Sequence, residues 1–237
     1  MNPPARLACR TCRGPVRNGF ARCYQCDLAA SQAGGLLADV VVPIGYALRG
    51  GQLAADLRLY KSGRSGAAAA ATRLRSTLAA FLRDHGGCVW RAAGMAGRPA
   101  AAAVVPSGQG RPGAHPLLGI VESCVDVPLA ALTAGPHGAA RGRGVGVGWL
   151  RVRGPVTGAD VLLVDDTWVS GGSAQSAAAA LKLAGAARVA VVVLGRHLDP
   201  ADPRSAGLLR AILPAAAPGG PCGIDGCPTP RAGSRPG

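Results

Sequence analysis

The sequence contains very little lysine and few aromatic residues. Of the 26 basic residues, Lys61 and Lys182 alone are lysines, and the others are arginines. Phe, Trp and Tyr make up 3% of the 237 residues, so alanine, valine and leucine must fill any core. Apolar residues reach 49%, which is enough for a buried core. The length fits one ordinary domain plus an appendage, since domains cluster near ~100–150 residues.

Long apolar runs are also missing. No stretch reaches the roughly 18 consecutive apolar residues of a membrane span, and the N-terminal residues MNPPARLACRTC lack the apolar core of a signal peptide. We therefore expect a soluble, cytoplasmic protein with no membrane partner. Thiols stay reduced in that compartment, so the eight cysteines indicate metal binding or burial rather than disulfides.

Acidic residues are scarce as well. The chain has 12 Asp and Glu against 26 Lys and Arg, a formal net charge of +14. Such a surface attracts polyanions, either nucleic acid or phosphorylated small molecules. Abundant Ala, Gly, Pro and Arg with almost no Lys is equally what a GC-rich genome encodes. The net charge alone therefore does not indicate which kind of polyanion the protein binds.

Three regions differ in composition. Residues 1–31 are polar and contain regularly spaced cysteines, residues 36–200 show a globular pattern, and residues 201–237 are rich in Pro, Ala and Gly and are expected to be a disordered tail. Within 36–200, apolar runs predict strands and 3.6-residue periodicity predicts helices. The expected strands are 36–48, 101–105, 127–132, 161–164 and 189–194, and the expected helices are 67–87, 117–125 and 174–184.

This alternation predicts an α/β fold with a parallel sheet flanked by helices. Gly86 and Gly87 are expected to end the long first helix. Ser173 is expected to cap the last helix, and Gly185 follows its end. Residues 135–148, rich in glycine without an apolar period, predict a mobile loop or an irregular hairpin.

The most informative segment is VLLVDDTWVSGGS, residues 161–173. A strand delivers Asp165 and Asp166 to its carboxyl end, which is where ligands bind in open α/β sheets. Ser170, Gly171, Gly172 and Ser173 follow and lead into a helix. Backbone N–H groups, hydroxyls and the helix N-terminus there can hold a phosphate.

The two carboxylates would repel that phosphate, so they need another purpose. As hydrogen-bond acceptors they suit the vicinal hydroxyls of a ribose. A sugar 5-phosphate therefore satisfies both halves of the segment. The alternative is an Asp-rich turn capped by Ser173, without a ligand.

The same segment resembles the phosphoribosyl-pyrophosphate signature of type I phosphoribosyltransferases, in which four apolar residues, two acids and a short linker precede a Ser/Thr-Gly-x-Ser/Thr motif. Two residues depart from the pattern: Thr167 and Trp168 stand where small or branched apolar residues are usual. The bulk of Trp168 predicts that it reshapes or partly covers the site.

The first region carries Cys9-x-x-Cys12 and, ten residues later, Cys23-x-x-Cys26. Two such pairs can supply the four thiolates of a tetrahedral, structural Zn²⁺ site. Two redox-active pairs are the alternative, but those motifs occupy a βαβ context that is missing here. The segment is also basic, with Arg6, Arg10, Arg13, Arg17 and Arg22 against Asp27.

Cysteine pairs in front of this segment resemble the ComF/GntX family, whose members carry zinc knuckles before a type I phosphoribosyltransferase domain. The likeness includes Lys61 of LYKSG and the strand-loop VVPSGQGRPG. It implies a phosphoribosyltransferase-like fold with a small N-terminal zinc-binding segment that uses four cysteines. PGAHPLLG, residues 112–119, stands where the family usually has Arg-Gly-Phe-Asn-Gln.

The resemblance assigns further residues to the site. Ser107, Gly108 and Arg111 are expected to bind pyrophosphate with Mg²⁺, and the flexible loop that closes over the substrate corresponds to the region of Arg141 and Arg143. An ordinary surface loop is the alternative for the first set.

The remaining histidine and cysteine residues of interest have structural interpretations or a possible role in metal binding. His115 precedes a proline at an expected helix start, which favours capping or packing. Cys88 and Cys124 are expected as buried thiols, and Cys222 and Cys227 are compatible with a second metal site.

Two functions are consistent with these features. The first is a phosphoribosyltransferase that transfers ribose-5-phosphate from phosphoribosyl pyrophosphate to an unidentified nitrogen nucleophile, with Asp165 and Asp166 as the central residues. The second is a non-catalytic ligand-sensing protein of the ComF type, whose basic zinc segment contacts DNA or a protein partner.

Overall fold

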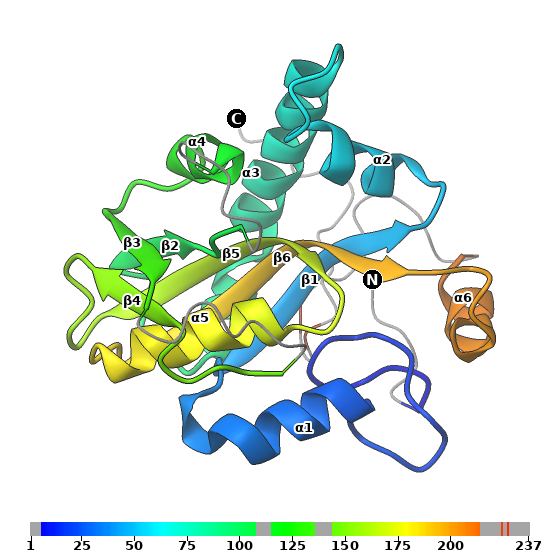
Figure 1. Ribbon diagram of the computed structural model, residues 1–237, viewed down its shortest axis with the longest axis horizontal. Coiled ribbons are helices and arrows are strands. Elements are labelled where there is room, and N and C mark those ends of the chain that lie inside the picture. The colour runs from blue at the N-terminus through cyan, green and yellow to red at the C-terminus, as the bar shows by residue number, and fades with distance from the viewer. Residues whose placement is uncertain (1–5, 108–114, 136–143, 214–223, 225–226, 228–237) are drawn as a thin grey trace.

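The computed structural model describes residues 6–107, 115–135, 144–213, 224 and 227. Six strands form one sheet in the order β1-β6-β5-β2-β3-β4, parallel throughout except for β4, which pairs antiparallel with β3 (Figure 1). The strands are β1 Val40–Leu48, β2 Ala101–Val104, β3 Leu129–Ala134, β4 Leu150–Arg153, β5 Asp160–Trp168 and β6 Arg188–Leu198. The parallel sheet predicted from the sequence is thereby confirmed.

Helices cover both faces of this sheet (Figure 1). They are α1 Tyr24–Ala33, α2 Gln52–Leu59, α3 Ala67–Ala92, α4 Pro116–Glu122, α5 Gly172–Leu183 and α6 Ala206–Ile212, with short 3-10 turns η1 Gly34–Leu36 and η2 Pro203–Ser205. Four elements, α1, α2, α6 and β4, were not predicted from the sequence. No helix in the described part of the chain combines the length and apolarity needed to cross a membrane.

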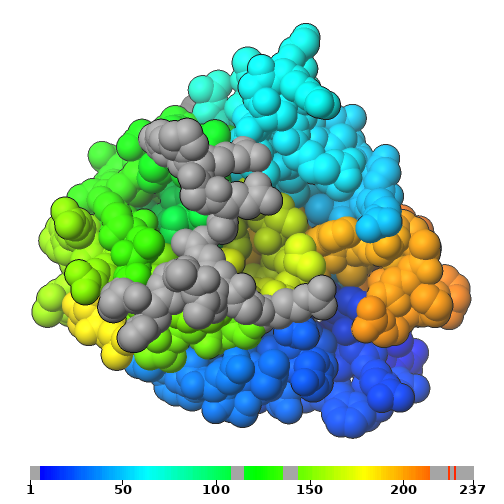
Figure 2. All heavy atoms as spheres, in the orientation of Figure 1, coloured from blue at the N-terminus to red at the C-terminus, as the bar shows by residue number. Residues whose placement is uncertain are grey.

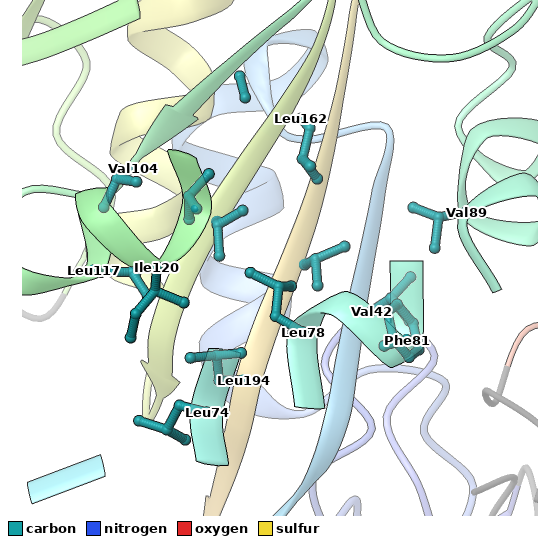
Figure 3. Close-up of a cluster of buried hydrophobic side chains, with 14 of the residues drawn as sticks. Val42, Leu74, Leu78, Phe81, Val89, Val104, Leu117, Ile120, Leu162 and Leu194 are labelled. Carbon is teal, nitrogen blue, oxygen red and sulfur yellow. The ribbon is translucent and has the colours of Figure 1, made fainter. Parts of the chain in front are cut away.

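Alternate residues of each strand enter two separate cores, as the two-residue period of a strand requires. Val42 and Leu162 pack with Leu74 and Leu78 of α3 on one face (Figure 3). Leu163, one residue on, joins the core on the other face, beneath α5. The central strands are buried on both faces, which explains their unbroken apolar runs.

The bounds of all three predicted helices differ from those expected, and α4 ends at Glu122 rather than near residue 125. α3 continues through Gly86 and Gly87 to Ala92, because the buried Cys88 and Val89 behind the glycines hold the last turns against the core. α5 begins two residues earlier than expected, with Gly171 rather than Ser173 at the N-cap position. A glycine fits there because its φ of 85° lies in the left-handed region.

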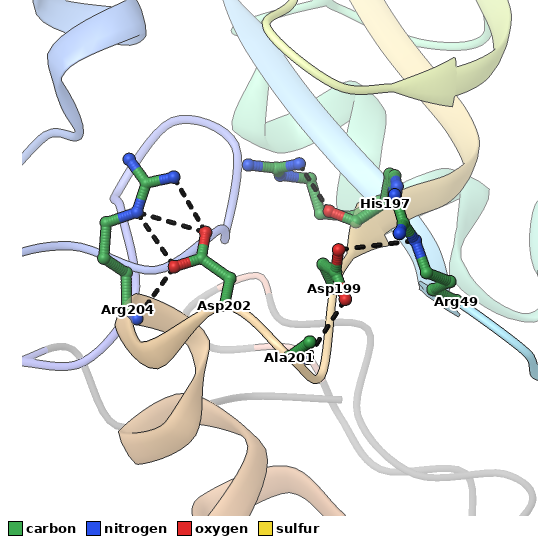
Figure 4. A network of polar contacts seen from close by, with 7 residues as sticks. Arg49, His197, Asp199, Ala201, Asp202 and Arg204 are labelled. Atoms are coloured by element: carbon green, nitrogen blue, oxygen red, sulfur yellow. Dashed lines mark hydrogen bonds and ion pairs between the residues drawn. The ribbon is translucent and has the colours of Figure 1, made fainter.

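The beginning of the range expected to be a disordered tail is ordered. Asp199 forms an ion pair with Arg49 Nε at 3.3 Å and accepts a hydrogen bond from Ala201 N at 3.0 Å, and Asp202 caps η2 through Arg204 N (Figure 4). α6 follows, and its buried residues form a third small core with Leu198 of β6. Local capping and this apolar face outweigh the disorder-prone composition.

Candidate functional site

The carboxyl ends of the neighbouring strands β2 and β5 meet at one edge of the sheet. Asp165 and Asp166 lie near the carboxyl end of β5, and Ser107 follows the adjacent strand β2. The chain then leads from β5 through Ser170 into α5. In the space-filling view this yellow-green part of the chain lies recessed between the cyan surface of α2 and the orange end of β6 (Figure 2). This edge is where ligands bind in open α/β sheets.

Asp166 is the more constrained carboxylate. Its side chain is buried, and its Oδ2 accepts hydrogen bonds from Tyr60 OH and Lys61 Nζ, both at 2.6 Å. Burial opposes ionisation of this carboxyl, but the Lys61 charge and the two hydrogen bonds outweigh it, so the pKa of Asp166 is lowered. Asp166 is therefore an ionised acceptor, and Lys61 brings compensating positive charge to the acidic pair.

Asp165 has the opposite environment. Burial, reinforced by repulsion from the ionised Asp166, raises the pKa of Asp165 to about 8, although its Oδ1 accepts a hydrogen bond from Asp166 N at 2.9 Å. At neutral pH the free protein thus offers one carboxylate and one carboxylic acid. A diol can donate to the first and both donate to and accept from the second.

The raised pKa predicts a pH dependence of stability. Between the ordinary carboxyl pKa near 4 and about 8, the folded state keeps a proton on Asp165 that the unfolded chain releases, so stability falls as pH rises through this window. The slope from one proton is at most ~1.4 kcal/mol per pH unit. Asp165→Asn should flatten the decline of the free energy of unfolding between pH 5 and 8. Denaturant titrations across that range measure it; the exposed Asp126→Asn serves as control, and an equal slope in all three proteins would contradict the prediction.

The loop after β5 is shaped for an anion. Gly171 and Gly172 are buried, and Ser173 is exposed at the start of α5. The first N–H groups of a helix have no partner within it, and α5 has no side-chain cap. Gly172 N reaches only Ser170 Oγ, at 3.4 Å. This helix N-terminus can therefore donate several hydrogen bonds to a phosphate.

Of the two effects expected from the bulk of Trp168, the structure shows that its ring shapes the loop from beneath and does not cover it. Its side chain is 1% exposed and lies beneath the loop. A Cβ at Gly171 would overlap Cζ2 of its indole ring. The tryptophan side chain thus lies beneath the glycine loop at residues 170–173. Glycine at position 171 is required both by this contact and by the backbone conformation.

Gly171→Ala should therefore destabilise the protein and displace the loop. The left-handed backbone alone costs ~1 kcal/mol in a non-glycine residue, and the overlap with Trp168 adds ~1–3 kcal/mol. Gly158→Ala is a matched control, since Gly158 has a φ of 70° and a Cβ there would meet open space. Chemical denaturation of both variants, with titration of phosphate, measures the difference. Equal destabilisation by the two substitutions would show that the indole does not constrain the loop.

The other predicted anion-binding residues are only partly described. Ser107 is half-buried directly after β2. Gly108, Arg111, Arg141 and Arg143 lie outside the described residues. The predicted hairpin around the last two is supported at its ends, where β3 and β4 pair antiparallel.

His115 lies at the start of α4, as the sequence predicted. Its Nδ1 accepts a hydrogen bond from Leu117 N at 3.2 Å, and Pro116 follows as the first residue of the helix. The side chain thus satisfies one of the N–H groups that a helix N-terminus leaves open. The capping role expected for His115 is confirmed.

The four N-terminal cysteines converge as their spacing predicts. The Sγ atoms of Cys9, Cys12, Cys23 and Cys26 all lie within 4.8 Å of one another. Mutual hydrogen bonding lowers the pKa of Cys9 and Cys23 and raises the pKa of Cys12 and Cys26, as expected of close thiols that cannot all ionise without a cation. Four sulfurs at this spacing can hold one metal ion, and a tetrahedral all-thiolate set fits Zn²⁺.

The cysteine segment is packed onto the sheet through Arg196 of β6. The Arg196 guanidinium lies against Gly14, where a Cβ would overlap it, and its NH1 donates to Trp168 O at 3.0 Å. Tyr46 OH donates to Arg13 O at 2.8 Å. Trp168 belongs to the same core cluster as three of the cysteines. A continuous contact thus runs from the cysteine segment to Trp168, beneath the glycine loop.

A cavity of about 440 Å³ adjoins this contact. Arg10, Arg13 and Arg22 line it, and it reaches Trp168 and Ser170. Asp165 and Asp166 are not among its described lining residues. The acidic pair therefore belongs to the open edge of the sheet, and we place the candidate site there because the ionisable groups and the helix N-terminus converge at that edge.

Sequence reasoning missed the role of Tyr60. Its hydroxyl donates to Asp166 Oδ2, although 106 residues separate them. The only signal was its position next to Lys61 in LYKSG, which by itself does not point to Asp166. Tyr60 and Lys61 reach the site because they directly follow the end of α2 at this edge of the sheet.

Comparisons with known proteins add little. No known family and no curated protein matches the sequence. Among solved structures, the purine phosphoribosyltransferase from Pyrococcus horikoshii Ot3 is similar, with 16% identity, a TM-score of 0.34, and coverage of 55% of this chain and 88% of that chain. A likeness of this extent carries no functional argument, so function must be inferred from the site.

Proposed function

We propose that the protein binds phosphoribosyl pyrophosphate at the edge formed by β5 and α5 and transfers its ribose-5-phosphate group to a nitrogen nucleophile. The observation that carries the proposal is the order of groups along one strand-loop-helix. An ionised and a neutral carboxyl, Asp166 and Asp165, precede a glycine loop at an uncapped helix N-terminus. The ComF/GntX membership suggested by the cysteine pairs is part of this proposal.

Each half of the site recognises one part of the ligand. The N–H groups at the start of α5, with Ser170 and Ser173, hold the 5-phosphate. Asp166 accepts a hydrogen bond from a ribose hydroxyl, while its Oδ2 also receives Tyr60 and Lys61. Asp165 holds the neighbouring hydroxyl.

The chemistry needs no protein nucleophile. A bond forms between the nucleophile's nitrogen and C1 of the ribose, and the bond from C1 to the pyrophosphate oxygen breaks, with its electron pair leaving on pyrophosphate. The oxocarbenium-like state between them resembles that of glycosyl transfer. The protein contributes orientation, and the negative charge of Asp166 lies on the ribose side, where positive charge develops.

Mg²⁺ is expected to accompany the pyrophosphate. The oxygen donors at this edge, Asp165 and Ser107, match the preference of a hard cation for oxygen ligands. Bound there, Mg²⁺ would neutralise charge on the leaving group. Gly108 and Arg111 follow Ser107 in the chain and are proposed to contact the same group.

The test is a titration followed by an assay. Isothermal titration should detect phosphoribosyl pyrophosphate binding with Mg²⁺, and a panel of nucleobases and amines should then be screened for release of pyrophosphate. Absence of binding would reject the proposal. Binding without release by any acceptor would favour the second candidate function.

That second candidate is a non-catalytic sensor whose cysteine segment contacts nucleic acid. The observation favouring it is a pair of exposed aromatic residues in a chain that has few: Phe20 is 64% and Tyr24 74% exposed, with exposed Arg17 and Arg22 nearby in the segment. Aromatic rings flanked by arginines form stacking platforms for single-stranded nucleic acid.

Fluorescence polarisation with a single-stranded oligonucleotide tests this candidate. Stacking contributes ~1–3 kcal/mol per base, so Phe20→Ala/Tyr24→Ala should weaken binding about tenfold or more. Affinity should also fall steeply with salt, by about 0.7 in log–log slope per phosphate contact. Undetectable binding at ~50 mM salt, or binding unchanged by the double substitution, would exclude this role.

A further inference from the structure

A second group of metal-binding side chains lies in a different core from the four N-terminal cysteines. His85 and Cys88 project from α3, and Cys227 approaches them from the C-terminal part of the chain. Cys227 Sγ is 3.3 Å from His85 Nδ1 and 3.4 Å from Cys88 Sγ. One ligand atom from each of the three residues fits within 4.8 Å of the others.

The helical pair is pre-arranged. His85 and Cys88 are three residues apart on α3, so they share one helix face. Both are buried. The imidazole packs against Phe81, with ring centroids 5.4 Å apart, and Arg91 NH2 lies 3.7 Å from Cys88 Sγ, where its charge favours a thiolate.

Cys227 is brought to this pair by local structure. Its backbone N donates to Ile224 O at 3.1 Å. Ile224 and Cys227 both pack against the core that contains Cys88. The contact between Cys88 and Cys227 joins residues 139 positions apart. The C-terminal residues around Cys227 are rich in Pro, Ala and Gly and contain few large apolar side chains.

We propose that His85, Cys88 and Cys227 form a second metal site, for Zn²⁺. Thiolate and imidazole ligands select zinc among the common divalent ions. With Zn–S of ~2.3 Å and Zn–N of ~2.0–2.1 Å, a tetrahedral centre separates two sulfurs by about 3.8 Å and a sulfur from a nitrogen by about 3.6 Å. The observed 3.4 and 3.3 Å are close to these values, as is the 3.8 Å between Cys12 and Cys23 in the first cluster.

The alternative chemistry is a disulfide between Cys88 and Cys227. The two Sγ atoms are 3.4 Å apart, well beyond the ~2.05 Å of a covalent bond. A bound metal also explains why the His85 imidazole lies next to Cys227, whereas a disulfide between the two cysteines gives no role to this imidazole. The fourth ligand is a water molecule or another donor; Cys222 lies outside the described residues and is not needed for the assignment.

Bound zinc would fasten the C-terminal segment around Cys227 to the last turns of α3. Zinc would also favour the continuation of α3 past Gly86 and Gly87. His85 and Cys88 lie on either side of these glycines and must stay in helical register to bind the same metal ion. The site is separate from the proposed phosphoribosyl site and does not depend on it.

Metal analysis of the full-length protein tests the assignment. Reduced protein, purified with Zn²⁺ and freed of excess metal, should contain two equivalents of zinc. Cys88→Ser/Cys227→Ser should contain one, and Cys124→Ser, which changes a half-buried thiol outside both clusters, should contain two. In the cobalt-loaded protein, thiolate-to-metal charge-transfer absorption should fall by about one third in the double variant, because two of six thiolate ligands are lost.

Two results would overturn the proposal. One is a single equivalent of zinc in the wild-type protein together with the same value in the double variant. The other is a Cys88–Cys227 disulfide-linked peptide in digests of protein purified without reductant and handled with zinc present. If the double variant does not fold, His85→Asn replaces it, and two full equivalents of zinc with an unchanged cobalt spectrum in that variant would equally refute the site.

Discussion

Changing Asp165 and Asp166 together to Asn should lower the affinity for phosphoribosyl pyrophosphate at least tenfold. The change at Asp166 removes a hydrogen bond to a charged group, which contributes roughly 1.5–3 kcal/mol, and the change at Asp165 weakens a second bond from a ribose hydroxyl. A loss of ~1.4 kcal/mol is a factor of ten. Isothermal titration in the presence of Mg²⁺ measures the change, with thermal melts to confirm that the variant is folded.

The response to inorganic phosphate or sulfate should be the opposite. In the double variant Lys61 loses the carboxylate to which it donates at 2.6 Å, and the negative charge near the start of α5 disappears. Simple anions should therefore bind equally well or slightly more tightly. Asp126→Asn, an exposed carboxylate elsewhere, controls for net charge. Unchanged sugar-phosphate binding in a folded double variant would show that the acids do not recognise the ribose.

Cys9→Ser/Cys12→Ser should remove one equivalent of zinc and unfold the cysteine segment. Structural zinc contributes ~10–16 kcal/mol to the folding of small finger peptides, far more than this short segment could replace by packing. Hydrogen exchange should become fast throughout residues 6–33. The core between α3 and the sheet, which contains no residue of the segment, should keep its protection.

Elemental analysis and hydrogen-exchange mass spectrometry on the full chain measure these effects, and Cys124→Ser is the matched control. Retention of both metal and protection in the double variant would mean that the four thiols form an apolar cluster instead of a metal centre. Less than half an equivalent of zinc in reduced wild-type protein would have the same meaning.

The parts of the site that follow one another in the chain were predictable from the sequence. Asp165 to Ser173 follow a buried strand and precede a helix, and each feature leaves a local pattern in residue type. The four cysteines also lie close together in the sequence. The two Cys-x-x-Cys turns have only to approach each other for the four sulfur atoms to form one cluster. Such patterns predict the β5–α5 segment and the metal cluster because their geometry is determined over a few residues.

The parts built from distant residues were not predictable. Tyr60 is joined to Asp166 across 106 residues, and Cys227 to Cys88 across 139. The N-cap was misassigned because a serine is the commoner cap, whereas Trp168 beneath the loop leaves room only for glycine at the turn. Gly86 and Gly87 were taken as a helix end because propensity is local, while the burial that holds the helix together is tertiary.

The contact that runs from Gly14 through Arg196 and Trp168 to Gly171 joins the four-cysteine cluster to the loop before α5. If zinc in the cysteine segment steadies this path, it raises the affinity of the loop for a phosphate by some factor. Reciprocity then requires a bound phosphate to raise the affinity for zinc by the same factor. The proposed N-terminal metal would then be held more tightly when the proposed sugar-phosphate site is filled, so that the supply of ligand would affect how much of the protein carries the metal.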